Sequence, residues 1–458
     1  MQEILIGNIK EKGNDGVSVT DAVVNEEGHL IISLSNNTTI DAGTVNLGDK
    51  FVPEDYALPI LYFDGDVSGM DKDNAVDLQY RYRFKDESEK DESEKVKYKS
   101  GTASVKWQGS SSINYPKKNY TVKFDQAFEP VKGWGAHNKY CMKANWIDFS
   151  HARNVVSAKL WGKMCRGTRK EQEQFEDLLT AGLPNCGAID GFPIVIVING
   201  EYMGLYSFCI PKDAWMFGLD ENDVNHCIIG AGGYNTQTAF KAMPYIVEDI
   251  KKDPSGHFEW EYISDAATDE DKARFQESLQ NLFTELNAVS SKEDLYKLTN
   301  ITNIEFFIQY YVYVALLSAY DCITKNYLLF TVDGTKWQIS AYDLDSTFGL
   351  ETDGASFFNV NHKSYAKLAE SNMLFRKIYD YAKDRLKAWH NQFVSTNIGN
   401  RYVTQEFYNY CKDIPKVYFD EEIKRWTSLP STNTSNLDQI TNYYRLRLEF
   451  LQSEVDSW

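Results

Sequence analysis

The spacing of apolar residues changes along this 458-residue chain from the two-residue period of strands to the 3.6-residue period of helices. Up to about residue 210 the apolar residues form short runs, separated by turn residues. From residue 268 onward they recur at helical spacing over most of the sequence. Strands in the first half and helices in the second predict an α+β fold with a β-rich and a helical lobe. Hydrophobic residues make up 43 % of the chain, which is enough for more than one packed core.

The N-terminal segment, residues 1–55, differs in residue composition from the rest of the chain and is expected to form a small all-β module. It is rich in β-branched residues, and apolar side chains occupy alternate positions from Leu30 to Leu34. Turn-forming residues at 25–28 and at 35–37 divide it into a meander of three short strands. So small a sheet buries little surface by itself, so we expect it to pack on the following domain, on copies of itself or on another protein. A decorated hairpin at the start of a monomer is the alternative.

Residues 56–215 form the expected β-rich lobe. A buried strand is predicted over residues 58–63, and further strands are predicted between residues 96 and 124. The sharpest signal is a hairpin, whose runs at 192–198 and 202–208 flank an Asn-Gly turn. This lobe is therefore expected to be built on sheet rather than on helix.

Two features interrupt these strands. The pentapeptide DESEK occurs twice in tandem at residues 86–95, and so polar a repeat is expected to be a solvated loop. Residues 144–164 have helical spacing, with Asp148 or Ser150 as the residue that caps the helix.

Residues 216–458 are expected to form the mainly helical lobe. Thr268 precedes three acidic residues, which is typical of a helix N-terminus. A second helix is predicted over residues 304–318, where apolar residues recur at helical spacing.

The charges and the cysteines exclude several classes of function. Lys and Arg number 48 against 66 Asp and Glu, and the resulting charge of −18 argues against a non-specific grip on nucleic acid or anionic membranes. No apolar run approaches the roughly 20 residues that a membrane span needs, and the first residues lack the pattern of an export signal. The seven cysteines are odd in number and include no C-x-x-C pair, so buried free thiols in a reducing compartment are expected.

The stretch with the most chemical information is residues 304–349. An apolar helix is followed by a loop with Asp321 and Asn326, and a hairpin then carries the chain to Asp343 and Asp345. We therefore expect one amide and two or three carboxylates to meet in a small volume. These are oxygen ligands that Mg²⁺ prefers, and phosphates and waters commonly complete its coordination shell.

The spacing of Asp321 and Asn326 is that of the D-x-x-x-x-N pattern in protein-kinase catalytic loops, where the aspartate orients the attacking hydroxyl. Lys325 would add positive charge for a γ-phosphate. The D-L-D-x-x-F-G run that begins at Asp343 stands where the metal-binding aspartate of a kinase is expected. The alternative is that these side chains only cap turns and bind backbone amides.

A phosphate site also needs hydrogen-bond donors and positive charge. Small residues in a turn between two predicted strands would let backbone amides and hydroxyls approach an anion, and lysines follow this turn. The candidates for this role are Gly109, Ser110, Ser111, Lys118, Lys123 and Lys143. Either Lys123 or Lys143 is expected to contact the α- and β-phosphates of a nucleotide. The alternative for each is that it is only a solvated lysine on a strand.

Four sequence blocks together resemble the CotH kinase family, a divergent branch of the protein-kinase-like fold. Residues 105–124 are similar to its K-G-R-G-N-S-T-W and P-K-K-P-Y-x-I-K-F motifs, and residues 143–154 are similar to A-N-x-x-D-x-S-x-x-R-N. Residues 198–206 resemble its N-G-x-Y-x-G-x-Y hairpin, and residues 321–349 contain the acidic pattern described above. The likeness extends over about residues 58–450.

This resemblance implies a bilobal protein-kinase-like fold that transfers phosphate from ATP to a Ser or Thr hydroxyl with Mg²⁺ or Mn²⁺. It implies the catalytic role for Asp321, metal binding for Asn326 and Asp343, and a second acidic contact for Asp345.

The chain departs from the family pattern in three places. Gln108 stands where the family has Arg, Ser110 stands where it has Asn, and no Glu follows Tyr206 as it does in many members. An active kinase and a catalytically inactive pseudokinase scaffold are therefore both open. A metal-dependent hydrolase would also use clustered aspartates, but the seven histidines are scattered without ligand spacing, so this class ranks last.

The N-terminal segment resembles short β modules of bacteriophage head-fibre and tail-fibre proteins, through its G-x-D-G-V-S-V-T-D-A and H-L-I-I-S-L-S runs. This implies a structural protein of a virion, assembled in the host cytoplasm and attached through residues 1–55 to other virion or coat proteins. The expected partners also include a protein substrate and further copies of this chain, with no nucleic acid and no membrane span.

Overall fold

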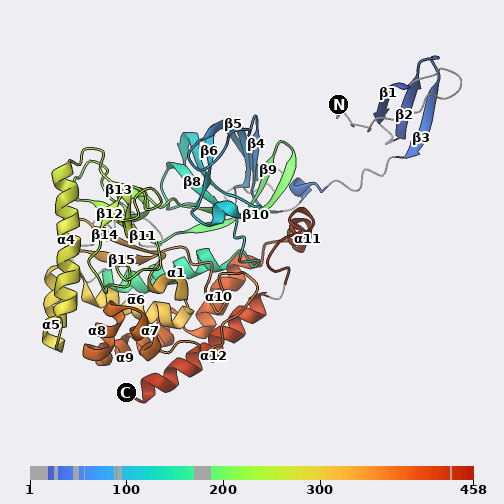
Figure 1. Ribbon diagram of the computed structural model, residues 1–458. Helices are drawn as coiled ribbons and strands as arrows, with labels where there is room; N and C mark the ends of the chain where they lie inside the picture. The colour runs from blue at the N-terminus through green and yellow to red at the C-terminus, as the bar shows by residue number, and fades with distance from the viewer. Residues whose placement is uncertain are drawn as a thin grey trace. The chain divides into compact units, whose positions relative to one another are not determined.

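The computed structural model describes residues 19–24, 29–44, 51–55, 57–86, 89, 95–169, 187–433 and 436–458 (Figure 1). Contacts divide the chain into two compact units, Met1–Val52 and Pro53–Trp458. The lobe boundary expected between residues 215 and 216 lies inside the second unit and stays a prediction.

The unit Met1–Val52 contains the expected all-β segment. Its strands are β1 (Val19–Val24), β2 (His29–Leu34) and β3 (Thr39–Thr44), which pair in chain order as an antiparallel meander. All six residues of β2 are half-buried. The predicted turn at residues 25–28 lies outside the described residues.

The strands that begin the unit Pro53–Trp458 close into a seven-stranded barrel, drawn in blue to green in Figure 1. The barrel order is β10-β8-β7-β6-β5-β4-β9, and β9 pairs with β10 to close it. All neighbours are antiparallel except β4 and β9. The strands are β4 (Ile60–Asp64), β5 (Val76–Lys85), β6 (Val96–Gln108), β7 (Asn119–Phe128), β8 (His137–Lys143), β9 (Gly191–Ile198) and β10 (Glu201–Cys209).

The predicted strands and hairpin of this region are confirmed. Asn199 and Gly200 between β9 and β10 both have positive φ, of 50° and 76°, which is the backbone of a tight hairpin turn. Along β7, Tyr120, Val122 and Phe124 are buried, which is the alternation of a strand with one face in a core.

A second sheet of five strands follows, in the order β12-β13-β11-β14-β15. Its neighbours are antiparallel except β12 and β13. Its strands are β11 (Cys227–Ala231), β12 (Ile246–Val247), β13 (Phe258–Ile263), β14 (Tyr327–Thr331) and β15 (Gln338–Ala341). The last two strands form the hairpin predicted between Asn326 and Asp343.

Helices form most of the remainder, and many of them lie below the second sheet in Figure 1. They are α1 (Arg153–Arg169), α3 (Ala214–Phe217), α4 (Asp269–Ala288), α5 (Lys292–Lys297), α6 (Ile304–Leu317), α7 (Tyr365–Ser371), α8 (Met373–Tyr381), α9 (Lys383–Gln392), α10 (Asn400–Cys411), α11 (Lys416–Arg425) and α12 (Asn436–Asp456). The predicted helix cap at Thr268 is confirmed. Its hydroxyl accepts a hydrogen bond from the Asp271 backbone, and the Asp271 carboxylate accepts one from the Thr268 backbone. In α6 every residue except Glu305 is buried, so this helix is the centre of the helical core.

The helix predicted over residues 144–164 begins nine residues later, at Arg153. Residues 144–152 turn instead, with positive φ at Asn145 and His151. The predicted capping role of Asp148 nevertheless holds, since its carboxylate accepts a 2.8 Å hydrogen bond from the Arg153 backbone. Tight turns with left-handed residues are the reason why helical spacing of apolar residues did not yield helix here.

The described residues contain no helix that is long and apolar enough to cross a membrane.

Most of the DESEK repeat lies outside the described residues. The described cysteines are free thiols, buried except for the half-buried Cys411, while Cys186 lies outside the described part of the chain.

Candidate functional site

A cavity of about 690 Å³ is lined by residues of both the barrel and the five-stranded sheet. The ends of β6 and β8 contribute from the barrel, and β11 and β14 contribute from the sheet. Most of the residues singled out in the sequence line this cavity. They are Gly109, Ser110, Ser111, Lys143, Asp321, Lys325, Asn326, Asp343 and Asp345.

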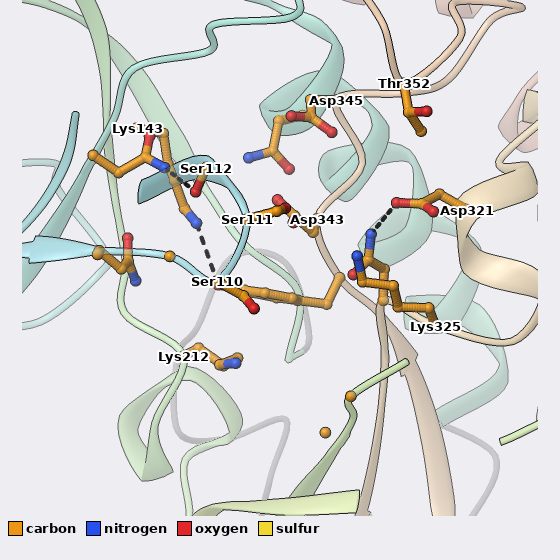
Figure 2. A pocket seen from close by; sticks show the side chains of 18 of the residues that line it. Ser110, Ser111, Ser112, Lys143, Lys212, Asp321, Lys325, Asp343, Asp345 and Thr352 are labelled. Atoms are coloured by element: carbon orange, nitrogen blue, oxygen red, sulfur yellow. Dashed lines mark hydrogen bonds between the residues drawn. The ribbon is translucent and has the colours of Figure 1, made fainter. Parts of the chain in front are cut away.

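The loop after α6 supplies the first acid and the amide. Helix α6 ends at Leu317, the following residue Ser318 has a left-handed φ of 54°, and Asp321 lies in the short 3₁₀ turn after it. Asn326 also has a φ of 54°, a conformation that asparagine tolerates better than most residues. Its side-chain amide donates a hydrogen bond to Asp321 Oδ2 (Figure 2). The other carboxylate oxygen, Asp321 Oδ1, is buried and has no hydrogen-bond partner.

The β14–β15 hairpin delivers the other two acids. Asp343 follows β15 with a φ of 54°, and Asp345 lies two residues further on. Between them, the Leu344 backbone donates a 3.0 Å hydrogen bond to Asn154 Oδ1 at the start of α1. Asn154 itself lines the cavity, so the first turn of α1 holds the acidic segment in place.

The acids lie close enough to disturb each other's protonation. The pKa of Asp321 is raised to about 6, because burial and the nearby charge of Asp343 outweigh the opposing effect of Lys325. Burial, followed by the charges of Asp343 and Asp321, raises the pKa of Asp345 well above its ordinary value. Carboxylates crowded in this way favour a cation between them.

This donor set fits a magnesium ion of a particular kind. In the described part of the chain, no three His, Cys, Asp or Glu side chains are grouped closely enough to hold a metal by themselves. Mg²⁺ is usually bound by only one or two carboxylates, with substrate phosphates and waters as its other ligands. Asp343 and the amide of Asn326 are suited to such a site, and Asp321 lines the same cavity with its Oδ1 unpartnered.

The serine turn, residues 109–112, faces the same cavity from the barrel side (Figure 2). Gly109 has a φ of 125°, and a Cβ on it would clash with Ser112 Oγ, so only glycine fits there. Ser110 and Ser111 are exposed and line the cavity. The turn therefore presents hydroxyls and backbone to any ligand in the cavity.

Of Lys118, Lys123 and Lys143, only Lys143 lines the cavity. It is 8 % exposed, and its Nζ lies 3.4 Å from the hydroxyl of Tyr342, next to Asp343 in sequence. Burial alone would lower the pKa of Lys143, but the neighbouring Tyr342 and the Asp343 carboxylate outweigh burial and raise it. It is therefore a cation held beside the acids.

The structure does not place Lys123 or Lys118 at the cavity. Lys123 is exposed and pairs in register with Lys139, four residues along β8 from Lys143. Because a strand rises about 3.3 Å per residue, this is roughly 13 Å from the cavity end of β8. Lys118 donates to the carbonyls of Ile113 and Tyr115, so it closes the turn instead of facing a ligand.

Several cavity residues have no counterpart in the sequence-based candidates. Lys212, Tyr342 and Tyr115 line the cavity, and the Lys212 ammonium lies 4.7 Å from the centre of the Tyr342 ring. Burial, followed by the charges of Asp345, Asp343 and Asp321, raises the pKa of Tyr115, so this tyrosine also faces the acids. The position of Tyr342 directly before the D-L-D run is a sequence signal that could have identified it. Lys212 has no recognisable pattern around it in the sequence.

One wall of the cavity carries the acids and the Asn326 amide, and another carries the serine turn and a buried lysine. This arrangement defines a class of protein suited to handling phosphate groups. Comparison with sequence models of protein families matches residues 105–451 to the CotH kinase protein family, which is most of the chain. The chain belongs to this family, and kinase-like is therefore the correct general description of it. No curated protein matches the chain.

Proposed function

We propose that this protein is an ATP-dependent phosphotransferase with a bilobal kinase-like arrangement, in which the barrel is one lobe and the second sheet with its helices is the other. The single observation that carries the proposal is the shared cavity. Asp321, Asn326 and Asp343 line it together with Lys143 and the serine turn. Family membership supports the use of ATP and a divalent metal.

In this proposal Asp321 is the residue that receives the acceptor's proton. The hydroxyl oxygen of a Ser or Thr side chain attacks the γ-phosphorus, the bond from that phosphorus to the β,γ-bridging oxygen breaks, and ADP leaves. The hydroxyl proton passes to the Asp321 carboxylate, whose free oxygen Oδ1 has no competing partner. A pKa of about 6 places this group within the range in which carboxylates exchange protons near neutral pH.

Lys143 and the serine turn would hold the phosphates from the barrel side. A buried lysine contributes charge, and the turn contributes hydroxyls and backbone amides. Asn326 and Asp343 would hold Mg²⁺ or Mn²⁺, which when bound neutralises phosphate charge. Lys325 lines the same cavity, and its charge acts on Asp321, so it would add positive charge near the γ-phosphate.

The test is transfer of radiolabelled phosphate from ATP in the presence of Mg²⁺ or Mn²⁺, with a mixture of Ser- and Thr-containing proteins and the protein itself as acceptors. Transfer is expected to vanish in Asp321→Ala and in Asp343→Ala. Asp265→Ala is the matched control, because Asp265 is an exposed loop residue that does not line the cavity. Transfer that persists in both site variants would refute the proposal.

The second candidate is a catalytically inactive scaffold that serves as a structural component of a virion. The observation that favours it is the sheet of Met1–Val52, in which Ile32 pairs with Ala22 and Ile40 on one face. Ile40 is 48 % exposed, so this apolar face has room for a partner. We propose attachment to other virion or coat proteins through this unit.

Purified particles distinguish the two candidates. If the scaffold role holds, deletion of residues 1–50 removes the protein from particles, and Asp321→Ala leaves particle assembly and host attachment unchanged. Retention of the truncated protein on particles would contradict attachment through the N-terminal unit.

A further inference from the structure

The Lys117 side chain is among those that line the cavity, and its ammonium is fully engaged in hydrogen bonds. This side chain is 1 % exposed and donates to the carbonyl oxygens of Ala144, at 2.9 Å, and of Leu205. Its third partner is Glu422 Oε1 at 2.8 Å, on α11, 305 residues further along the chain. All three donors of the ammonium are therefore used, and no phosphate can reach it without breaking one of these bonds.

The Glu422 carboxylate, like the Lys117 ammonium, is held by several contacts. Its Oε2 accepts a 2.7 Å hydrogen bond from the Leu205 backbone, and His151 Nε2 lies 3.1 Å from its Oε1. Gly204 makes room for it, since a Cβ there would lie 2.8 Å from Glu422 Oε2. Burial alone would raise the pKa of Glu422, but the charges of Lys117 and His151 hold it at about 2, so the carboxylate is ionised.

Lys117 is the first of three consecutive residues, 117–119, whose side chains form hydrogen bonds around the serine turn. Lys118 Nζ donates to the carbonyls of Ile113 and Tyr115, in the segment that joins the serine turn to β7. Asn119 accepts a 2.7 Å hydrogen bond from the Ala144 backbone and donates to Ser112 Oγ at 3.2 Å. Lys117 and Asn119 thus both bind Ala144, which adjoins Lys143 in sequence. The end of β8 and the serine turn are therefore tied together by residues that line the cavity.

We propose that Glu422 is a positioning residue of the phosphate site, which acts through Lys117 to hold the serine turn and the β8 end in register. This inference rests on the proposed function, because it assigns the turn to nucleotide phosphates. Glu422 touches no ligand itself. Helix α11 is far from the cavity loops in sequence, and in this proposal it helps to hold them in place.

The experiment compares Glu422→Gln with Glu421→Gln in the full chain. Glu421 is the matched control, because it lies one residue away on α11 and pairs at the surface with Lys424. Gly204→Ala is the second site variant, since its methyl group displaces the Glu422 carboxylate without removing the charge. Gly200→Ala is its control, because a Cβ at Gly200 meets nothing within 4 Å. Hydrogen exchange without nucleotide and the dissociation constant of MgATP are both measured.

The proposal predicts at least tenfold faster exchange in residues 109–118 for both site variants, at a temperature where each is folded, and no change for the controls. It also predicts a dissociation constant for MgATP raised at least tenfold in the site variants. Faster exchange confined to α11, or an unchanged turn in both site variants, would overturn it. If the wild-type protein binds no MgATP, the proposed function fails, and the exchange result alone decides whether Glu422 holds the turn.

Discussion

The side-chain amide of Asn326 donates a hydrogen bond to the carboxylate of Asp321, five residues earlier on the same loop. This bond occupies one carboxylate oxygen and leaves Oδ1 without a partner in the cavity wall. The left-handed backbone of Asn326, with a φ of 54°, turns its side chain back toward the acid. The D-x-x-x-x-N spacing is therefore a geometric unit in this protein.

Asn326→Ala is expected to lower the rate of phosphate transfer at least 100-fold, because it removes both the donor that orients Asp321 and a proposed metal ligand. Alanine also fits the left-handed backbone less well than asparagine does. Initial rates at saturating MgATP test this. Asn361→Ala, in an exposed loop, is the control and is expected to keep the wild-type rate. A rate within threefold of wild type in Asn326→Ala would contradict the assigned role.

The two candidate lysines should behave differently. Lys143→Ala is expected to weaken MgATP binding at least tenfold, about 1.4 kcal/mol, because it removes a buried cation from the cavity wall. Lys123→Ala is expected to leave binding unchanged, since Lys123 is an exposed residue of β7 outside the cavity. Calorimetric titration with MgATP measures both. Equal losses in the two variants would show that general positive charge, and not the position of Lys143, matters.

Gly109→Ala tests the serine turn. The added methyl group meets Ser112 Oγ, and the left-handed backbone adds strain, so we expect a loss of about 1–3 kcal/mol in the free energy of unfolding. Gly133→Ala has a φ of 96° but open space around its Cβ, and should cost only the strain, about 1 kcal/mol. Urea denaturation measures both. The account also expects Gly109→Ala, unlike Gly133→Ala, to lose MgATP binding, and retention of binding would count against it.

Stability should fall in mild acid because of His390. Burial lowers the pKa of this side chain to about 4 in the folded protein, below its ordinary 6.5. The unfolded chain therefore takes up a proton first as the pH falls. The stabilisation is complete above pH 6.5 and is lost as the pH falls toward 4, by about 3 kcal/mol.

His390→Gln is the variant that isolates this effect. The imidazole lies 2.9 Å from the Tyr365 hydroxyl and 3.2 Å from Gln452 Oε1, and a glutamine amide offers a donor and an acceptor that do not titrate. Urea denaturation at pH 7 and at pH 4 should show a smaller loss for the variant than for wild type. Equal losses would assign the acid sensitivity to other groups.

The acidic part of the site was predictable because it is local. Asp321, Asn326 and Asp343 lie within 23 residues, joined by one hairpin whose turn residues are visible in the sequence. The fold class followed from the change of hydrophobic period, and the hairpin between β9 and β10 followed from its Asn-Gly turn.

The cationic part was not predictable in the same way. Lys123 and Lys143 lie on neighbouring strands, and only the register of β7 against β8 separates the exposed lysine from the cavity lysine. Lys117 gave no signal of its role, because its carboxylate partner Glu422 is 305 residues away. Closure of the strands into a barrel likewise depends on the pairing of β4 with β9, which no local pattern encodes.

The most direct test of the central claim is thermal unfolding of the wild-type protein and of Asp343→Asn, each with and without MgATP. Convergence of Asp321, Asn326 and Asp343 on one phosphate site predicts that MgATP at about 100 times its dissociation constant stabilises the wild-type protein by about 2.7 kcal/mol. It also predicts that the melting temperature of Asp343→Asn does not rise at the same nucleotide concentration. An unchanged melting temperature in the wild-type protein, or an equal rise in both proteins, would contradict the claim.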